Sequence, residues 1–179
     1  KSENEDYFND AISTIGENMS LRRIAKVDGD HVYSYVHNAL VPGMGQIGVV
    51  VAINGNDPRI DEIGGKIAMH IAANKPEFMT IADVDPKAVE REKKVFIESG
   101  ATAGKPENIV EKMVDGRIQK WYAESVLEEQ PFVMDPSKKV KDVIAEHGGK
   151  LAGYAFYVLG EGIQKREDNL ADEVAKMLQ

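Results

Sequence analysis

The run of residues 47–53 constrains the fold of this chain more than any other segment. Its sequence, IGVVVAI, contains only apolar residues and glycine, and five of its seven residues are Ile or Val. A short β-branched run of this kind is typical of a strand buried in a sheet, because branched side chains pack well on a pleated surface. Residues 54–58 (NGNDP) then carry strong turn signals. We therefore expect a central strand over residues 47–53.

Three other segments are expected to be strands. Residues 31–38 alternate, so that His37 shares one face with two tyrosines, and residues 150–159 are rich in Tyr and Phe between glycine turns. Residues 20–27 are expected to form a further strand. The glycine-rich residues 39–46 between two of these strands are expected to form a long flexible loop.

Apolar residues that recur at steps of three and four predict helices before, between and after these strands along the chain. Each such stripe is one apolar face that must be buried against another element. The expected helices cover residues 7–18, a segment with Ile60, Ile63, Ile67 and Ile71, a segment with Val140, Val143 and Ile144, and a terminal segment with Leu170, Val174, Met177 and Leu178.

Residues 86–124 differ from the rest of the chain because they are strongly charged. Asp85 and Pro86 form a good helix start, with Asp as N-cap and Pro in the first turn. Glycines near residues 100–104 break this helix, and Pro106 opens a second one. Two helices joined by a short connection pack antiparallel. We expect an α+β fold, a small antiparallel sheet covered by helices, with this helical hairpin inserted into it.

The composition argues against several classes of function. The net charge is −8 with Lys and Arg scattered along the chain, whereas nucleic-acid-binding proteins usually present a basic patch that neutralises phosphates. The chain has no cysteine, which excludes disulfides, thiol catalysis and Cys-ligated zinc. Its apolar runs fall far short of the ~20 residues that span a bilayer. We expect a cytoplasmic protein that binds neither membranes nor nucleic acid directly.

Few residue patterns in this chain indicate catalysis. Gly43, Gly45 and Gly48 have the spacing G-x-G-x-x-G, but the dinucleotide fingerprint needs a helix after the glycines, and here a strand is expected. We therefore predict no cofactor, and no spacing of ligand residues predicts a metal site. The residues favour a binding protein over an enzyme. A small hydrolase that uses clustered carboxylates, such as Glu128 and Glu129, is a weaker alternative.

Four histidines are candidates for specific roles. His31 and His37 lie roughly 20 Å apart at ~3.3 Å per residue, too far to share one metal on a regular strand. His70 is expected to be a satisfied histidine at the boundary of the core, in the middle of a helix. His147 is expected to end a helix, and both positions are usually structural. His37 is expected at a strand end beside the glycine-rich loop, exposed and without a structural partner, where contact with another protein is common.

Five segments of the chain are similar to the elongation factor Ts family, and they occur in the family's order. Each segment alone is a weak signal, but together they extend over nearly the whole chain. They are residues 15–23 (IGENMSLRR), 67–78 (IAMHIAANKPEF), 111–120 (EKMVDGRIQK), 130–138 (QPFVMDPSK) and 160–163 (GEGI).

The resemblance implies a domain organisation. The family's core consists of two related lobes, each with a small antiparallel sheet, and a helical hairpin projects from the second. The resemblance also implies that the chain lacks the family's small N-terminal helical module and its Thr-Asp-Phe-Val loop. Residues 1–19 would then hold the last helix of the first lobe, residues 20–85 and 125–163 the second lobe, residues 86–124 the hairpin, and residues 164–179 a C-terminal helix.

The same resemblance implies a function and contact residues. Members of the family bind elongation factor Tu and promote its exchange of GDP for GTP, and they need no cofactor of their own. Ile15, Gly16 and His37 match family positions that contact elongation factor Tu. Without the module and the loop, the chain is expected to be incomplete for exchange. The alternative is a structural interaction or dimerisation module without exchange activity, which would form a homodimer.

Overall fold

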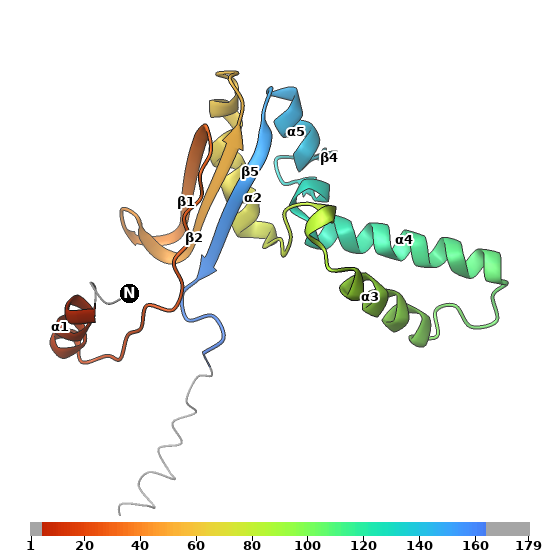
Figure 1. Cartoon of the computed structure of the whole chain (residues 1–179), viewed down its shortest axis with the longest axis horizontal. Coiled ribbons are helices and arrows are strands. Elements are labelled where there is room, and N and C mark those ends of the chain that lie inside the picture. Colours follow the sequence, from red (N-terminus) through yellow and green to blue (C-terminus); the bar gives the residue numbers. More distant parts are fainter. Residues whose placement is uncertain (1–4, 164–179) are drawn as a thin grey trace, which may run out of the picture.

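The computed structural model describes residues 5–163 and shows a three-stranded antiparallel sheet packed against helices (Figure 1). The strand order is β1 (His31–Val41), β2 (Met44–Asn54) and β5 (Lys150–Val158), so β2 is the central strand. The α+β class and the strands expected in these three segments are confirmed. The helix expected over residues 164–179 lies outside the described residues.

Helix α2 (Ile60–Asn74) covers one face of the sheet and forms the core with it. Its isoleucines recur on one side of the helix, and the alternate residues of β2 point toward them. Burying each of these side chains contributes about 1.5–3 kcal/mol relative to an exposed position. The core of these two elements consists of Val49, Val51, Ile53, Ile60, Ile63, Ile67 and Ile71, none of which is more than 3% exposed.

The prediction of a strand over residues 20–27 is wrong, because this segment has no regular secondary structure. It crosses the face of the sheet opposite α2. A Cβ built on Gly153 would lie 3.3 Å from Val27, and one on Gly29 would lie 2.8 Å from Ala52. A segment that crosses a sheet face lies beside no open strand edge, so its backbone cannot join the hydrogen-bond ladder.

The prediction of a flexible loop over residues 39–46 is also wrong, because the two strands extend into this segment. β1 runs to Val41 and β2 begins at the paired residue Met44, which leaves Pro42 and Gly43 as the turn. Gly43 has φ +79°. Pro before a residue of positive φ is a combination that favours a type II turn. The β1–β2 hairpin is therefore longer and more regular than its glycine content suggested.

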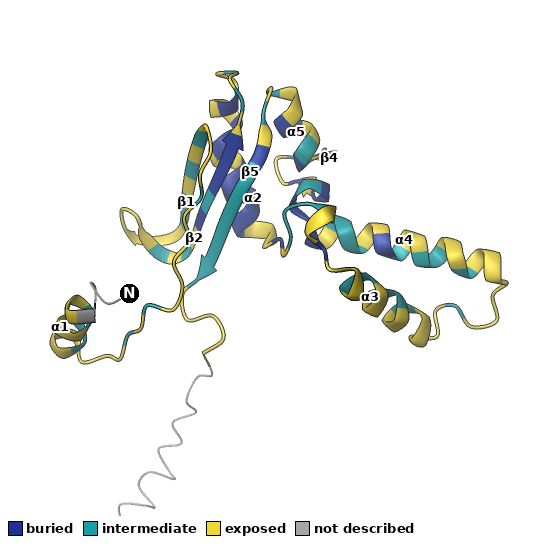
Figure 2. Ribbon diagram, in the orientation of Figure 1, coloured by how far each residue is buried: buried dark blue, intermediate teal, exposed yellow. Residues whose placement is uncertain are grey.

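The two charged helices pack as an antiparallel pair that projects away from the sheet (Figure 1). They are α3 (Pro86–Glu98) and α4 (Glu107–Ser125), which confirms both predicted helices. The Asp85 carboxylate caps α3 by accepting a hydrogen bond from a backbone N–H of its first turn, 2.9 Å away. An ion pair between Arg117 and Glu92 joins the two helices, 2.5 Å between Nη2 and Oε1. Most of both helices is exposed (Figure 2).

Buried residues just after α4 connect the helical hairpin to the rest of the fold. Leu127 is fully buried at the base of α4, and Phe132 is 4% exposed in the core. The helix that carries Val140 is confirmed, and a short strand pair that local sequence did not predict precedes it. The remaining elements are α1 (Glu5–Ile15), the 3₁₀ turns η2 (Ile81–Asp83) and η3 (Leu127–Glu129), the pair β3 (Pro131–Phe132) and β4 (Asp135–Lys139), and α5 (Val140–Glu146).

We expect limited proteolysis to cut the connection between α3 and α4 first. Residues 99–106 are almost entirely exposed, and the hairpin's own two helices contact little else. Exposed tips of this kind open at little cost and fit into a protease site. Elastase, which cleaves after small residues such as Ala101 and Ala103, followed by mass spectrometry of the first fragments, tests this expectation. A first cut inside the three-stranded sheet would contradict it.

Candidate partner-binding site

His37 lies within β1 rather than at its end, paired in register with Ile47 of β2. Its side chain is exposed, as expected. The expectation that it has no structural partner is wrong, because the hydroxyl of Tyr35 lies 3.1 Å from His37 Nδ1. The two rings are 6.1 Å apart and tilted by 36°. Sequence alternation placed both residues on one face but did not reveal this contact.

Tyr35 positions the imidazole of His37. The Tyr35 ring is partly buried against the core beside α2, so its own position is determined by packing. When its hydroxyl donates to Nδ1, the ring proton of the neutral imidazole is on Nε2. The His37 side chain then presents a hydrogen-bond donor to whatever lies against this face of the hairpin.

The residue after His37 changes the direction of the strand. Asn38 has φ +51°, a left-handed conformation that Asn tolerates better than most residues. Its side-chain amide donates to Gln46 Oε1 across the hairpin at 3.1 Å. The strand register then shifts between Ala39 and Val41, as in a β-bulge. The left-handed conformation of Asn38 and the bulge after it therefore determine the direction of the end of the hairpin.

Ile15 and Gly16 lie at the end of α1. Gly16 has φ +79° and donates its N–H to Ile12 O at 2.8 Å, so it terminates the helix as a left-handed cap. This conformation accounts for the glycine without any partner. Ile15 is different, because its large apolar side chain is 59% exposed in the absence of another protein. The helix expected over residues 7–18 therefore ends earlier, at this cap.

A groove of about 610 Å³ connects the α1 segment to the end of the sheet. Its walls come from the segment after α1 and from β2 near the end of the β1–β2 hairpin. The last residues of β5 lie at this same end of the sheet (Figure 1). The structure therefore brings the segments that carry Ile15, Gly16 and His37 to one end of the sheet. The groove is lined by Phe8, Asn18, Met19, Ser20, Leu21, Arg22, Arg23, Gly45, Gln46, Gly48, Tyr157, Val158, Leu159, Gly160 and Ile163.

Two arginines hold this segment against the end of β5. Arg22 donates to the Glu161 carbonyl at 2.6 Å, and Arg23 forms an ion pair with the Glu161 carboxylate at 2.5 Å. The Arg23 guanidinium also lies 4.7 Å from the centre of the Tyr157 ring, close enough for a cation–π contact. These side-chain contacts hold the segment that the sequence suggested was a strand.

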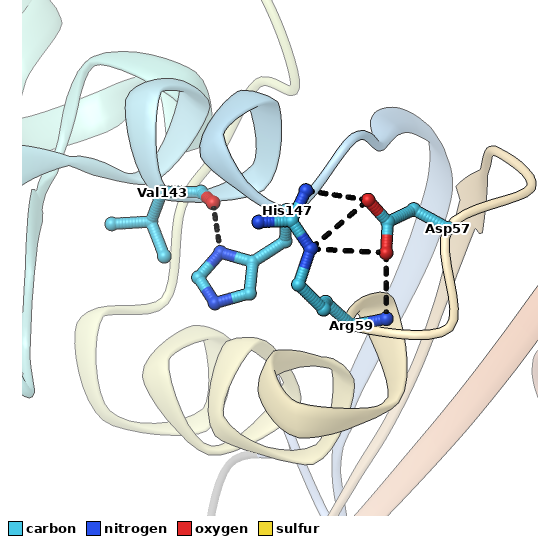
Figure 3. A network of polar contacts seen from close by, with 4 residues as sticks. All are labelled: Asp57, Arg59, Val143 and His147. Carbon is cyan, nitrogen blue, oxygen red and sulfur yellow. Dashed lines mark hydrogen bonds and ion pairs between the residues drawn. The ribbon is translucent and has the colours of Figure 1, made fainter.

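A polar network at the opposite end of the sheet is structural (Figure 3). The Asp57 carboxylate accepts hydrogen bonds from the backbone and the guanidinium of Arg59 at 2.5–3.1 Å. These bonds lower the pKa of Asp57 to about 2. His147 Nδ1 donates to the Val143 carbonyl at 2.7 Å, as expected of a histidine at a helix end. His147 and Asp57 therefore already have partners within the chain.

Comparison with known proteins decides the family. The sequence model of a family described as "Elongation factor TS" matches residues 1–161. The chain belongs to the elongation factor Ts family. An elongation factor Ts of Hyphomonas neptunium is 49% identical over 174 residues, which are 97% of this chain and 58% of that protein.

Other relatives in the elongation factor Ts family match to a similar extent. The protein of Paracoccus denitrificans is 49% identical over 172 residues, 96% of this chain and 58% of that protein. The protein of Caulobacter vibrioides is 45% identical over 183 residues, 97% of this chain and 59% of that protein. The chain therefore spans somewhat more than half the length of these relatives.

Glu129, one of the two carboxylates on which the hydrolase alternative depends, is paired with two lysines in this member of the elongation factor Ts family. Glu129 is nearly buried, but Lys139 and Lys141 each contact one of its oxygens, at 2.6 and 2.5 Å. Burial alone would raise the pKa of Glu129, and the two ammonium groups outweigh it and hold the pKa below its usual range. No cluster of metal-ligating side chains occurs in this part of the chain, and none of its helices is long and apolar enough to cross a membrane.

Proposed function

We propose that this chain is the part of an exchange factor that binds elongation factor Tu in the cytoplasm and promotes the release of its GDP. The match to the elongation factor Ts family over residues 1–161 carries this proposal. The exposed Ile15 and His37 support it, since both present side chains that a partner can contact. In the proposed organisation, residues 20–85 and 125–163 form the lobe that anchors the partner.

Exchange requires no covalent chemistry. The factor binds the nucleotide-free partner more tightly than the GDP-bound partner, and by linkage it weakens GDP binding by the same factor. Each ~1.4 kcal/mol of this difference corresponds to a tenfold change in affinity. Contacts made by Ile15, Gly16 and His37 supply part of the difference. The chain spans about 58% of the length of its Hyphomonas neptunium relative, and in this proposal the parts of the family outside that span supply the rest.

The variant His37→Ala in the full-length factor tests the proposal. Since this side chain is exposed, the free energy of unfolding should change by no more than about 0.5 kcal/mol. Release of labelled GDP from elongation factor Tu should slow several-fold, because the lost contact is made with the distorted partner. His147→Ala, at the opposite end of the sheet, is the control and should leave release unchanged.

Two results would contradict the proposal. One is a destabilised His37→Ala protein with normal GDP release, which would make His37 a structural residue. The other is a full-length factor that self-associates in sedimentation experiments and does not bind elongation factor Tu. That second result would favour the dimerisation module.

A further inference from the structure

The β1–β2 hairpin is unusual in its lack of charge. No Asp, Glu, Lys or Arg occurs from His31 to Asn56, although 29% of the residues in the chain are charged. β1 is nevertheless an edge strand of the sheet, and exposed edge strands normally carry charges that prevent pairing with other proteins. Without such charges, the exposed end of this edge is open to contact with another protein.

The end of this hairpin exposes large apolar side chains. Leu40 is 88% exposed, Met44 68% and Val41 51%. β5 pairs with β2 only from Ile47 onward, so these three residues project beyond the third strand. Figure 2 shows this tip as an exposed extension of the sheet. We refer to Leu40, Val41 and Met44 as the apolar tip.

The apolar tip is a structured element. Val41 and Met44 are paired across the turn, and the Asn38–Gln46 hydrogen bond braces the two strands just below it. A preformed hairpin loses less conformational entropy on binding than a flexible loop does. The tip can therefore bind as a rigid protrusion.

We propose that the apolar tip inserts into an apolar pocket of the partner GTPase, beside the contact made by His37. This inference rests on the function proposed above. His37 precedes Leu40 by three residues on the same strand, about 10 Å along it. One partner surface can therefore contact both.

A second copy of the chain fits the tip less well. A stable interface between two proteins needs about 20–30 residues on each side, and three side chains on a narrow two-stranded projection are far fewer. A projection of this shape fits a pocket rather than a flat face. Anchors of this kind, buried in a pocket, contribute much of the affinity of an interface.

Two valines of β1 provide a matched test of the proposal. Val41 and Val32 are both 51% exposed, but Val41 lies at the tip and Val32 near the other end of the strand. In the full-length factor, Val41→Ser should weaken binding to nucleotide-free elongation factor Tu about tenfold, as measured by calorimetry. Val32→Ser should change it less than twofold. The double variant Leu40→Ser/Met44→Ser should weaken it on the order of a hundredfold.

The outcomes separate this inference from the proposed function. If the wild-type factor binds and all three variants bind equally well, the tip is not a contact, while the proposed function stands. If the wild-type factor does not bind at all, both fail. If Val41→Ser abolishes a dimer seen in sedimentation but leaves binding intact, a second copy covers the tip, and the inference is overturned. Thermal melts of each variant should match the wild type, because these side chains are exposed.

Discussion

Gly64→Ala should destabilise the protein by about 3 kcal/mol. Gly64 lies on the buried side of α2, and the ring of Tyr33 lies directly against its Cα. A Cβ at this position would be only 2.1–2.4 Å from three carbon atoms of that ring. The ring would have to leave its place on the helix, and the hydrogen bond from its hydroxyl to Asp61 at 2.5 Å would be lost. Overpacking and a lost contact therefore act together.

The neighbouring Gly65 is the matched control. It is exposed on the same helix, and a Cβ there would meet no atom within 4 Å. Gly65→Ala should therefore stabilise the protein by up to about 1 kcal/mol, because alanine is the better helix former. Urea unfolding of the two variants should give changes of opposite sign. Equal changes would show that Tyr33 does not pack on Gly64.

His70→Ala should cost about 3 kcal/mol of stability. His70 is fully buried. Its Nε2 lies 2.9 Å from Gln130 Oε1, and its Nδ1 accepts a hydrogen bond from the Val133 N–H at 3.2 Å. The substitution leaves a cavity, and it leaves the buried Gln130 Oε1 and the Val133 N–H without this partner. Urea unfolding, with His147→Ala as the control, measures the loss, and similar small changes in both variants would contradict this structural role.

His70 should also make stability depend on pH. Burial lowers the pKa of His70 below its usual value of 6.5, and the hydrogen bond to Gln130 only partly offsets this effect. Below pH ~6.5 the unfolded chain therefore binds more protons at this position than the folded protein, so stability falls as the pH falls. The stability that the neutral His70 contributes is fully present above pH ~6.5, and it is lost as the pH falls toward the pKa of His70 in the folded protein.

The variant His70→Ala tests this pH dependence. Between pH 7 and pH 5 the free energy of unfolding should fall less steeply in His70→Ala than in the wild type. An unchanged slope in His70→Ala would show that this histidine is not buried in its neutral form.

Several parts of this fold are determined by local sequence alone. The β-branched run at residues 47–53 became the central strand β2, and the repeating isoleucines of residues 60–71 became the buried face of α2. Asp85 caps α3, as its side chain and the proline that follows it predicted. Each of these features depends on residues close together in the chain, so periodicity and capping are sufficient to predict them.

Other parts were decided only by tertiary contacts. Residues 20–27 look like a strand, but they cross a sheet face and are held by side chains that reach Glu161 and Tyr157. Residues 39–46 look like a loop, yet pairing across the hairpin extends both strands through them. The position of the Tyr35 ring, which contacts His37, depends on its packing against the core. Pairing partners and packing neighbours come from distant parts of the chain, and local pattern does not encode which of them will meet.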